Sequence, residues 1–593
     1  MKPSAGRPGG MGAQPARPPA HAAAAAHPDA RAWGGRLYAM ASGWAAPLAL
    51  ALALLAGLFL RLGAPPLFDV DEGAFAEATR EMLERGDAVS TWLNGQPRYD
   101  KPILVYWLQA GSVLLFGPSE FAFRLPSALA AGAWIAAILA FTRRCADRGT
   151  AWAAAFIAAT TAGVTVIGRG AIADALLNLF IALAMFDIMR HAGVRYAPQR
   201  WQGQPPSPSP LSLRRALPSG PAGLPRGSAC LRRAFLWMGL GLLAKGPVAL
   251  LVPGGASLLA CALSGRIACW RRAARDPLGW LILLAVAAPW YLLEYGRRGD
   301  AFLQGFFMRH NVERFMAPMQ GHGGGALYYV PALLLVLLPY SGLFLLALRT
   351  LPAPRRRREQ EAAVFLWCWF GFVFVFFSLA GTKLPHYILY GATPLFILMA
   401  RRRHALCNRA PRSHALAFAP PLLLLGAVAA LPELLRRAAP TIRNAYVREA
   451  LGRGDVFDAA WRAGALCLLA AVLVLALWRT RPVWPRLAAA GLACACAIGA
   501  LLLPALGELQ QGPVKEAARL AQRAGWQVHG WRIDAPSFSV YRAAVTPAVA
   551  VPAPGQVILT RSDALDELAR LRGRGAARIL YRKGGVVLLH VEE

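Results

Sequence analysis

The stretch SGWAAPLALALALLAGLFLRLGAPPLFDVDEGAFAEATREMLERGD, residues 42–87, joins two segments of opposite character. Residues 42–63 are almost entirely apolar and are long enough to cross the hydrocarbon core of a membrane, which takes about 20 residues of helix. Directly after them, Asp69, Asp71 and Glu72 place three carboxyl groups side by side in the sequence. The pattern predicts a membrane-spanning helix followed by a charged loop at the membrane boundary.

The composition extends this prediction to the whole chain. Of its 593 residues 56% are hydrophobic and only 16% are charged, and apolar runs recur along its length. We therefore expect a mainly α, polytopic membrane protein. The net charge of +33 could indicate nucleic-acid binding, but the basic residues cluster between apolar runs, where they are typical of cytoplasmic loops. The nine cysteines follow neither a metal-binding nor a disulfide pattern.

The apolar runs predict 13 membrane spans. They lie near 42–63, 121–142, 151–168, 171–190, 234–246, 247–264, 278–295, 327–348, 362–380, 386–400, 415–432, 461–478 and 485–505. A cytoplasmic N-terminus places six basic loops on the cytoplasmic side, as the positive-inside rule requires. The division at Lys245 is critical, because one long helix there would place every later loop on the opposite side of the membrane.

The pattern also predicts domain boundaries. Residues 1–40 form a disordered extension, residues 41–505 the transmembrane domain, and residues 506–593 a small extracytoplasmic α/β domain. Within the transmembrane domain, 64–120 is the first extracytoplasmic loop and 192–232 a flexible cytoplasmic insertion.

Local patterns support these boundaries at both ends of the chain. The sequence preceding the first span is rich in Ala, Pro and Gly, and either Met1 or Met40 could be the true start. Near the C-terminus, ARLAQRAG is typical of a helix, whereas GQVILT, RILYR and GVVLLHV are typical of short strands joined by glycine turns.

Two further helices are predicted in the first loop. Apolar residues recur at helical spacing between 73 and 85, with Glu77, Arg80 and Glu81 on the other side, so we expect an amphipathic helix lying on the membrane interface. A second, apolar segment spans 102–117. Together the two would form a lid or cradle beside the charged turn.

The loop carries a resemblance to a known family. The sequence DVDEGAFAEATREMLERGD, continued by LNGQPRYDKPILVYWLQAGSVLLFG, resembles the first extracytoplasmic loop of the polyprenyl-phosphate-dependent glycosyltransferases. It is most similar to the bacterial ArnT-like aminoarabinose transferases, which are related to the protein O-mannosyltransferases. GRGAIADALLNLF, GLGLLAKGPVALLVP, RHNVERF and FFSLAGTKLPHYIL extend the resemblance over residues 42–400.

The resemblance implies a GT-C architecture with the active site at the extracytoplasmic membrane surface. It implies transfer of a sugar, 4-amino-4-deoxy-L-arabinose or another amino sugar, from undecaprenyl phosphate to a phosphate of lipid A. This reaction would take place on the periplasmic face of a bacterial inner membrane. It would modify lipopolysaccharide and relate the protein to polymyxin resistance.

The same resemblance suggests two catalytic carboxylates. Asp71 matches the family's acidic position in the first loop and would orient the acceptor, act as a general base or stabilise positive charge on the sugar. Asp174 matches a second acidic position, although an Asp at a helix start can also be a simple capping residue. Glu72 is an additional candidate.

Several other residues are expected to bind the donor phosphate or the substrate. They are Asp100, Lys101, Lys245, Arg314, Lys383 and Tyr387, with His310 and His386 as additional candidates. Lysine and arginine would compensate the charge of the departing phosphate. Asp100 and His310 leave a divalent metal open, since one His beside one carboxylate is a weak metal signal.

One departure from the family leaves the substrate open. ArnT-like sequences carry Arg and Tyr where this chain has Ala74 and Phe75. A related transferase acting on protein, O-antigen or another envelope acceptor is therefore the alternative within enzymes. A transporter would show ionisable residues near the bilayer midplane and an internal repeat, neither of which is evident, and a lipid-binding scaffold would not need so many converging charges.

Overall fold

The computed structural model describes residues 45–194, 226–318, 321, 323–352, 360–406, 411–573 and 575–592. The chain divides into two compact units, Met1–Leu48 and Ala49–Glu593. Of the first unit only the start of the helix Ala45–Phe59 is described. The predicted extension 1–40 and most of the predicted insertion 192–232 lie outside the described residues.

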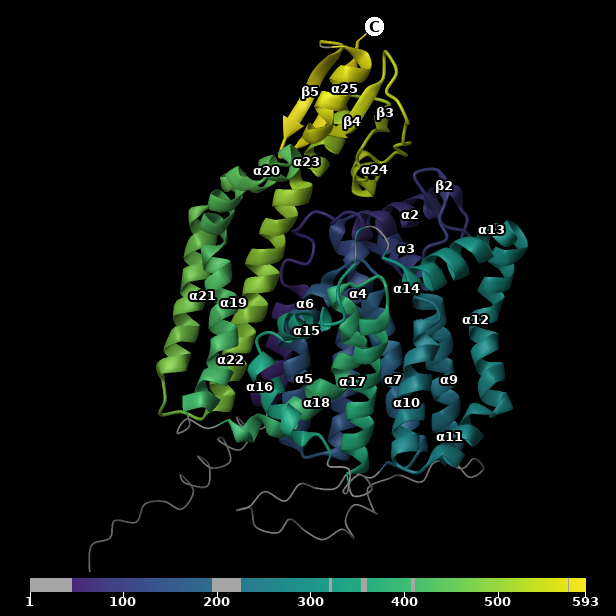
Figure 1. Ribbon diagram of the computed structural model, residues 1–593, viewed down its shortest axis with the longest axis vertical. Helices are drawn as coiled ribbons and strands as arrows, with labels where there is room; N and C mark the ends of the chain where they lie inside the picture. The colour runs from purple at the N-terminus through teal and green to yellow at the C-terminus, as the bar shows by residue number, and fades with distance from the viewer. Residues whose placement is uncertain are drawn as a thin grey trace, which may run out of the picture. The chain divides into compact units, whose positions relative to one another are not determined.

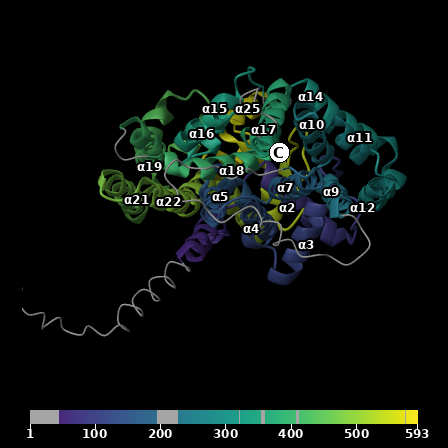
Figure 2. The ribbon, with the colours of Figure 1, turned by 90° about the horizontal axis from the view of Figure 1, so that it is seen from below.

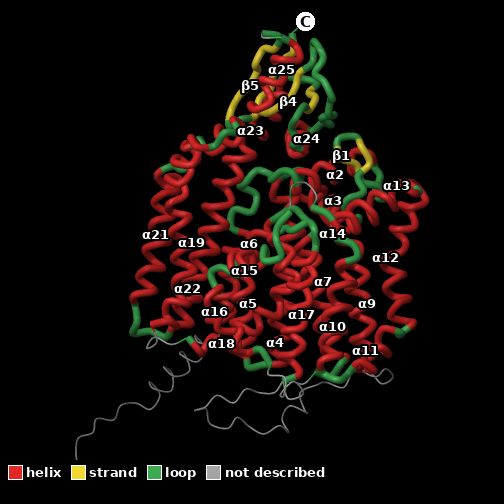
Figure 3. Tube along the Cα trace, viewed as in Figure 1, coloured by secondary structure: helices red, strands yellow, loops and turns green. Residues whose placement is uncertain are grey.

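Long apolar helices dominate the second unit, and several run side by side in Figures 1 and 3. Among the described residues, six helices are long and apolar enough to cross a membrane, or eight if two bent pairs each count as one span. The six are α4 (Glu120–Cys145), α12 (Pro277–Arg298), α17 (Glu361–Leu379), Pro411–Thr441, which contains α19 (Pro411–Ala438), α21 (Ala459–Leu477) and Val483–Arg523, which contains α22 (Val483–Cys496) and α23 (Leu503–Arg523). The chain is thus a multi-pass membrane protein, and the total of 13 spans stays a prediction.

Further helices belong to the helical part. They are α2 (Asp71–Arg85), α3 (Leu104–Phe116), α5 (Arg148–Thr160), α6 (Ala162–Arg169), α7 (Asp174–His191), α9 (Arg226–Ala244), α10 (Val248–Leu263), α11 (Ile267–Ala274), α13 (Asp300–Phe302), the π-helical segment η2 (Leu303–Glu313), α14 (Arg314–Met316), α15 (Tyr329–Val336), α16 (Ser341–Ala347), the 3₁₀ segment η5 (Pro385–Gly391), α18 (Ala392–Arg402) and α20 (Ala445–Leu451). Two strands, β1 (Trp92–Leu93) and β2 (Gln96–Pro97), pair in the first loop.

Two of the predicted spans are bent. The predicted span 151–168 is the pair α5 and α6, with a bend of 60° between the two helices. The predicted span 327–348 contains α15 and α16, with a bend of 115°. At the first bend the hydroxyl of Thr161 donates to the carbonyl of Ile157. At the second, Pro339 has no N–H to continue the helix. Apolar length alone predicts a span but not these breaks.

The predicted division at Lys245 is confirmed. Helix α9 ends at Ala244 and α10 begins at Val248. Between them Gly246 adopts a φ of +102°, which favours glycine, and a Cβ there would lie 2.9 Å from the ring of Phe306. The turn is therefore built into the sequence, and it leaves Lys245 at the end of a helix.

The C-terminal part forms a four-stranded sheet at one end of the helices (Figure 1). Its strands are β3 (Val528–Gly530), β4 (Val557–Arg561), β5 (Ala577–Lys583) and β6 (Val586–Val591), in the order β3-β4-β6-β5. Strands β3 and β4 are parallel, and the other pairs are antiparallel. The three strands predicted from sequence are present, and β3 is additional.

Alternation along the strands gives the sheet two apolar faces. Val586 and Leu588 of β6 pack with α23 and α24 (Pro536–Arg542) on one face. Val587 and Leu589 pack on the other face with Leu568 of α25 (Leu565–Arg572). Because α22 and α23 belong to one continuous helical stretch, the last apolar helix leads directly into this sheet.

The prediction that the first loop helix lies on the membrane interface is wrong. Almost all of α2 is buried, including Glu77 and Glu81, which are 0% and 1% exposed. Helix α24 packs against α2, and the buried charges are compensated: Glu77 pairs with Arg80, and Glu81 accepts from the backbone N–H of Gly95. The polar face of α2 therefore packs against other parts of the protein. Helix α3, by contrast, exposes Leu114 and Leu115.

Candidate active site

The predicted site residues come from segments far apart in sequence that meet at the end of the helices nearest the sheet. Asp174 is the first residue of α7, and Lys245 follows α9. Asp100 and Lys101 precede α3, and His310 lies in η2 just before α14. Figure 1 shows α2, α3 and α14 on this side. The fold thus gathers the charged residues that the sequence singles out.

A first cluster surrounds the buried carboxylate of Asp174. Its Oδ1 accepts from Lys245 Nζ at 2.7 Å and from the hydroxyl of Tyr390 at 2.5 Å. Lys245 Nζ also donates to Tyr390 and lies 5.2 Å from the centre of the Tyr387 ring, a cation–π distance. His386 Nε2 lies 3.5 Å from the same Asp174 oxygen. Asp174 is therefore more than a helix cap, since it holds the lysine in place.

A second cluster surrounds Asp100. Lys101 Nζ donates to its Oδ1 at 2.5 Å and Arg98 to its Oδ2 at 3.1 Å, while His310 Nδ1 lies 3.0 Å from Oδ1. Burial alone would raise the pKa of Asp100, but Lys101, His310 and Arg98 together hold it well below its usual range. Burial, reinforced by the positive charges of Arg314 and Lys245, lowers the pKa of Lys101. Asp100 is thus an anion held among cations.

A cavity of about 550 Å³, here called the charged cavity, joins the two clusters. Its polar lining consists of Asp100, Lys101, Lys245, His310, Asn311, Arg314, Thr382, Tyr387 and Tyr390. Much of the remaining wall is apolar, including Val248, Leu251, Phe307, Phe315 and Phe376. Within the described residues Arg314 Nε is buried without a hydrogen-bond partner. Cations beside an apolar wall suit a phosphate carried on a hydrocarbon chain.

Asp71 lies at the edge of this arrangement. It is exposed at the first position of α2, where the helix dipole favours a negative charge. It interacts electrostatically with Arg98, His386 and Tyr387. Among the described residues it has no hydrogen-bond or ion-pair partner in the fold. Of Asp69, Asp71 and Glu72, it is therefore the carboxylate that is available to a ligand.

The two carboxylates next to Asp71 in the sequence, Asp69 and Glu72, are engaged in the fold. Glu72 is buried and accepts two hydrogen bonds from Arg124, one from the N–H of Ala171 and one from the N–H of Phe68. It thereby joins the start of α2 to α4 and to the turn before α7. With these bonds in place, the Glu72 carboxylate holds the fold together.

Asp69 attaches the first loop to the C-terminal part. Its carboxylate accepts from the backbone N–H of Ser537 at 2.9 Å and from the Ser537 hydroxyl at 2.5 Å. Burial raises the pKa of Asp69 to about 7, although both hydrogen bonds from Ser537 oppose the shift. Gly73 leaves room for this contact, because a Cβ there would lie 2.0 Å from Asp69 Oδ1. The contact with α24 thus fixes the position of the loop that carries Asp71.

Not every candidate reaches the charged cavity. Lys383 Nζ donates to the carbonyl of Ala380 at 2.5 Å, and the neighbouring Thr382 lines the cavity instead. Sequence reasoning missed Arg98 and Tyr390. Tyr390 follows Tyr387 at helical spacing in HYILY, which is a usable signal, whereas nothing in the local sequence distinguishes Arg98 from a surface arginine.

Asp100 and His310 are the residues considered for a divalent metal, and His310 Nδ1 lies 3.0 Å from Asp100 Oδ1. No group of three or more His, Cys, Asp or Glu with suitable placement occurs in the part of the chain that the structure describes. The oxygens of Asp100 face Lys101 and Arg98, and Arg314 Nη1 lies 3.9 Å from Oδ1. Positive charges already surround the carboxylate, so the surroundings suit an anion better than a metal cation.

The departure at positions 74 and 75 has a structural counterpart. Ala74 and Phe75 are both buried, and Phe75 stacks on Tyr106 with ring centres 5.3 Å apart. The guanidinium of Arg98 lies 5.4 Å from the Phe75 ring. A cation is therefore present beside this position, but it comes from another segment of the loop.

Comparisons with known proteins agree with this picture. The family model described as dolichyl-phosphate-mannose-protein mannosyltransferase matches residues 100–202. An undecaprenyl phosphate-α-4-amino-4-deoxy-L-arabinose arabinosyl transferase of Aeromonas hydrophila is 32% identical over 60% of this chain and 59% of its own length. One from Shewanella sediminis is 29% identical over 58% of this chain and 57% of its own. The matches thus span less than two thirds of these relatives.

The crystal structure of ArnT from Cupriavidus metallidurans bound to undecaprenyl phosphate superposes with a TM-score of 0.71 at 21% identity. It covers 93% of this chain and 98% of ArnT, and the apo structure of the same protein gives the same values. At this identity the match establishes the fold. The chain therefore has the fold of ArnT, and over about three fifths of its length it is similar in sequence to the undecaprenyl phosphate-aminoarabinose arabinosyl transferases.

Proposed function

We propose that this protein is a glycosyltransferase that moves a sugar from undecaprenyl phosphate to a phosphate group of lipid A. The observation that carries the proposal is the charged cavity, where Lys101, Lys245 and Arg314 converge beside an apolar wall. The names of the similar proteins support undecaprenyl phosphate as carrier and an amino-arabinose as sugar. The apolar wall would take the start of the polyprenyl chain, and the cations its phosphate.

In this reaction an oxygen of the acceptor phosphate attacks C1 of the sugar. The bond between C1 and the carrier phosphate breaks, and undecaprenyl phosphate leaves with both bonding electrons. Lys101 and Arg314 stabilise the negative charge that develops on the leaving phosphate. An acceptor phosphate that is already anionic has no proton to lose, so Asp71 acts by positioning the acceptor and by stabilising positive charge on the sugar.

The remaining predicted residues orient or support the groups that contact the substrate. Asp174 and Tyr390 orient Lys245 toward the cavity, and His386 lies beside them. Asp100 and His310 orient Lys101 and line the phosphate site. Tyr387 contributes one wall, while Lys383 holds the turn that carries Thr382.

We further propose the topology that the sequence predicts. The transmembrane domain, residues 41–505, has 13 spans in the bacterial inner membrane, with the extension 1–40 and the insertion 192–232 in the cytoplasm. The loop 64–120 and the domain 506–593 lie in the periplasm. The basic loops predicted on the cytoplasmic side support this orientation.

The alternative is a related transfer to protein, O-antigen or another envelope acceptor. The buried residues Ala74 and Phe75 support this alternative, because they make the surroundings of Asp71 differ from the family pattern. Mass spectrometry of lipid A from cells with and without the protein distinguishes the two. An added amino-pentose supports the proposal, and unchanged lipid A with a changed glycoprotein or O-antigen supports the alternative.

A further inference from the structure

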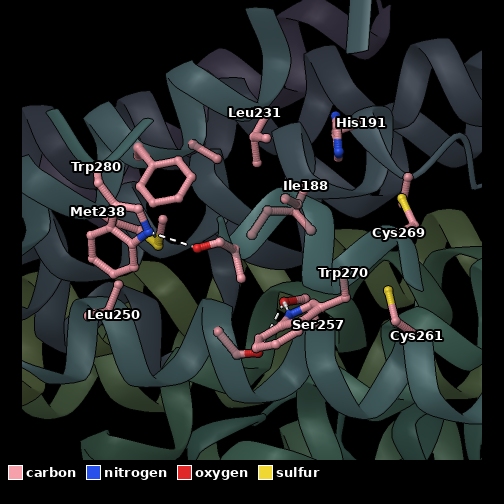
Figure 4. Close-up of a pocket in the computed structure, with 16 residues that line it drawn as sticks. Ile188, His191, Leu231, Met238, Leu250, Ser257, Cys261, Cys269, Trp270 and Trp280 are labelled. Carbon is pink, nitrogen blue, oxygen red and sulfur yellow. Dashed lines mark hydrogen bonds between the residues drawn. The ribbon is translucent and has the colours of Figure 1, made fainter. Parts of the chain in front are cut away.

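A second pocket, of about 260 Å³, lies away from the charged cavity, between α7, α9, α10, α11 and the start of α12 (Figure 4). We call it the apolar pocket. Leu231, Phe235, Met238 and Leu250 form much of its wall. The indole N–H groups of Trp270 and Trp280 donate to Ser257 Oγ and to the carbonyl of Ala274, so no indole donor is left unpaired beside an apolar ligand. Within the part of the chain that the structure describes, no Asp, Glu, Lys or Arg lines it.

The apolar pocket and the charged cavity lie at opposite ends of one helix. Asp174 is the first residue of α7, and His191, which lines the apolar pocket, is the last. Eighteen residues of helix span about 26 Å, close to the thickness of the hydrocarbon core. The end of the apolar pocket at His191 therefore lies in the membrane leaflet opposite to that of the charged cavity, and the pocket extends from there along α10 to Leu250.

Helix α11 closes the pocket at the membrane surface. Figure 2 shows it at the edge of the bundle, beside α10 and α12. Trp270 of this helix lines the pocket, and its neighbours Arg271 and Arg272 are exposed, as is Arg275 just after the helix. Among the described residues these three arginines make no ion pair. Such an amphipathic helix lies in the interface, where its cations meet lipid headgroups.

The nearby acidic group does not neutralise these arginines. Asp276 caps α12 by accepting from the N–H of Gly279, and it lies 3.7 Å from Arg232. The exposed face of α11, here called the rim, is thus positively charged, whereas its other face, with Cys269, Trp270, Ala273 and Ala274, lines the apolar pocket. Tryptophan is enriched at the depth where lipid headgroups meet acyl chains, and Trp270 and Trp280 fit this position.

We propose that the apolar pocket binds one anionic glycerophospholipid, with an acyl chain between α9 and α11 and the phosphate beside Arg271, Arg272 and Arg275. The charge of the rim is complementary to an anionic headgroup. A zwitterionic lipid would gain the apolar contacts but less from the arginines. The site is separate from the donor site, because among the described residues none lines both cavities.

The test uses the full-length protein in detergent, with native mass spectrometry to count bound phosphatidylglycerol and phosphatidylcholine. Gly254 lines the pocket, and a Cβ there meets no atom within 4 Å, so Gly254→Leu fills the pocket without a backbone clash. Gly426 of α19 is equally open, and Gly426→Leu is the matched control. A triple variant, R271Q/R272Q/R275Q, removes the rim charge.

The wild type and Gly426→Leu are expected to bind phosphatidylglycerol about tenfold more tightly than phosphatidylcholine, whereas Gly254→Leu loses both lipids. The triple variant should bind the two lipids equally. Equal binding of both lipids by the wild type would overturn the anionic assignment. Equal binding by Gly254→Leu and Gly426→Leu would overturn the site itself. Thermal unfolding of each variant verifies that it is folded.

Discussion

The two ends of α7 differ in what surrounds them. At its first residue, Asp174 meets Lys245 and Tyr390 beside a cavity lined by charges. At its last, His191 faces a pocket whose wall is apolar and whose arginines stand outside it. Charges inside a cavity can act on a reacting phosphate, whereas charges at a rim can only select what enters. One helix therefore separates a site suited to chemistry from a site suited to holding lipid.

The largest expected effect tests whether Asp71 acts at the reaction centre. Asp71→Asn should lower sugar transfer by the purified protein by about 10³-fold, because the variant loses the charge that positions the acceptor and stabilises the sugar. Glu84→Gln, at the half-exposed end of the same helix, is the control and should retain transfer. Transfer is measured with an undecaprenyl-phosphate-linked sugar and lipid A. Unchanged transfer in Asp71→Asn would remove it from the site.

The second prediction concerns the buried pair at the charged end of α7. Lys245→Met leaves Asp174 buried without its cation, which should lower the free energy of unfolding by about 3–5 kcal/mol and abolish transfer. Adding Asp174→Asn should restore much of the stability but no activity. Thermal unfolding and transfer are measured together. Recovered transfer in the double variant would show that the pair is only structural.

The third prediction tests the attachment of the first loop to α24. Ser537→Ala removes the hydroxyl that donates to Asp69, which should lower the free energy of unfolding by about 1–3 kcal/mol and reduce transfer through misplacement of Asp71. Ser539→Ala breaks a neighbouring bond to Asn94 and serves as the control. We expect the control to lose less activity. Equal losses would mean that the contact to Asp69 has no special role.

The fourth prediction follows from the pKa of Asp69, which burial raises from 3.8 to about 7. Between these values the folded state holds a proton that the unfolded state has lost, so stability should fall as the pH rises from about 4 through 7. The contribution is complete below pH 4 and absent above 7. Asp69→Asn should make the pH profile of thermal unfolding flatter. An identical profile would show that Asp69 does not titrate in this range.

The smallest expected effect is at the other end of α7. The triple variant R271Q/R272Q/R275Q should change transfer less than twofold in detergent, because its arginines lie at the far end of the helix from the charged cavity. Transfer is measured as for Asp71. A loss comparable with that of Asp71→Asn would mean that the two ends of α7 are coupled.

What the sequence predicts well is local. The turn at Lys245 follows from Gly246 and Pro247, and the strands near the C-terminus follow from their alternation. The resemblance to the glycosyltransferases identifies most of the charged residues that line the charged cavity. Asp71 is singled out on the same basis, and its exposure is consistent with that choice.

What the sequence does not predict depends on distant partners. Glu77 and Glu81 resemble solvent-exposed charges, and the packing of α24, α3 and β1 against α2 makes them buried. Glu72 looks like a second catalytic acid until Arg124 is placed beside it. Arg98 enters the site through the fold of its loop. In each case the local sequence does not reveal whether the charged side chain faces water, a ligand or another part of the protein.

The hydrogen bonds between Asp69 and Ser537 join residues that are 468 positions apart. A ribosome adding about 5–20 residues per second needs roughly half a minute to a minute and a half to synthesise the intervening chain. During that time α2 has no α24 to cover Glu77 and Arg80. The newly made first loop therefore stays incomplete until α24 has been synthesised, so the candidate active site is completed only at that point.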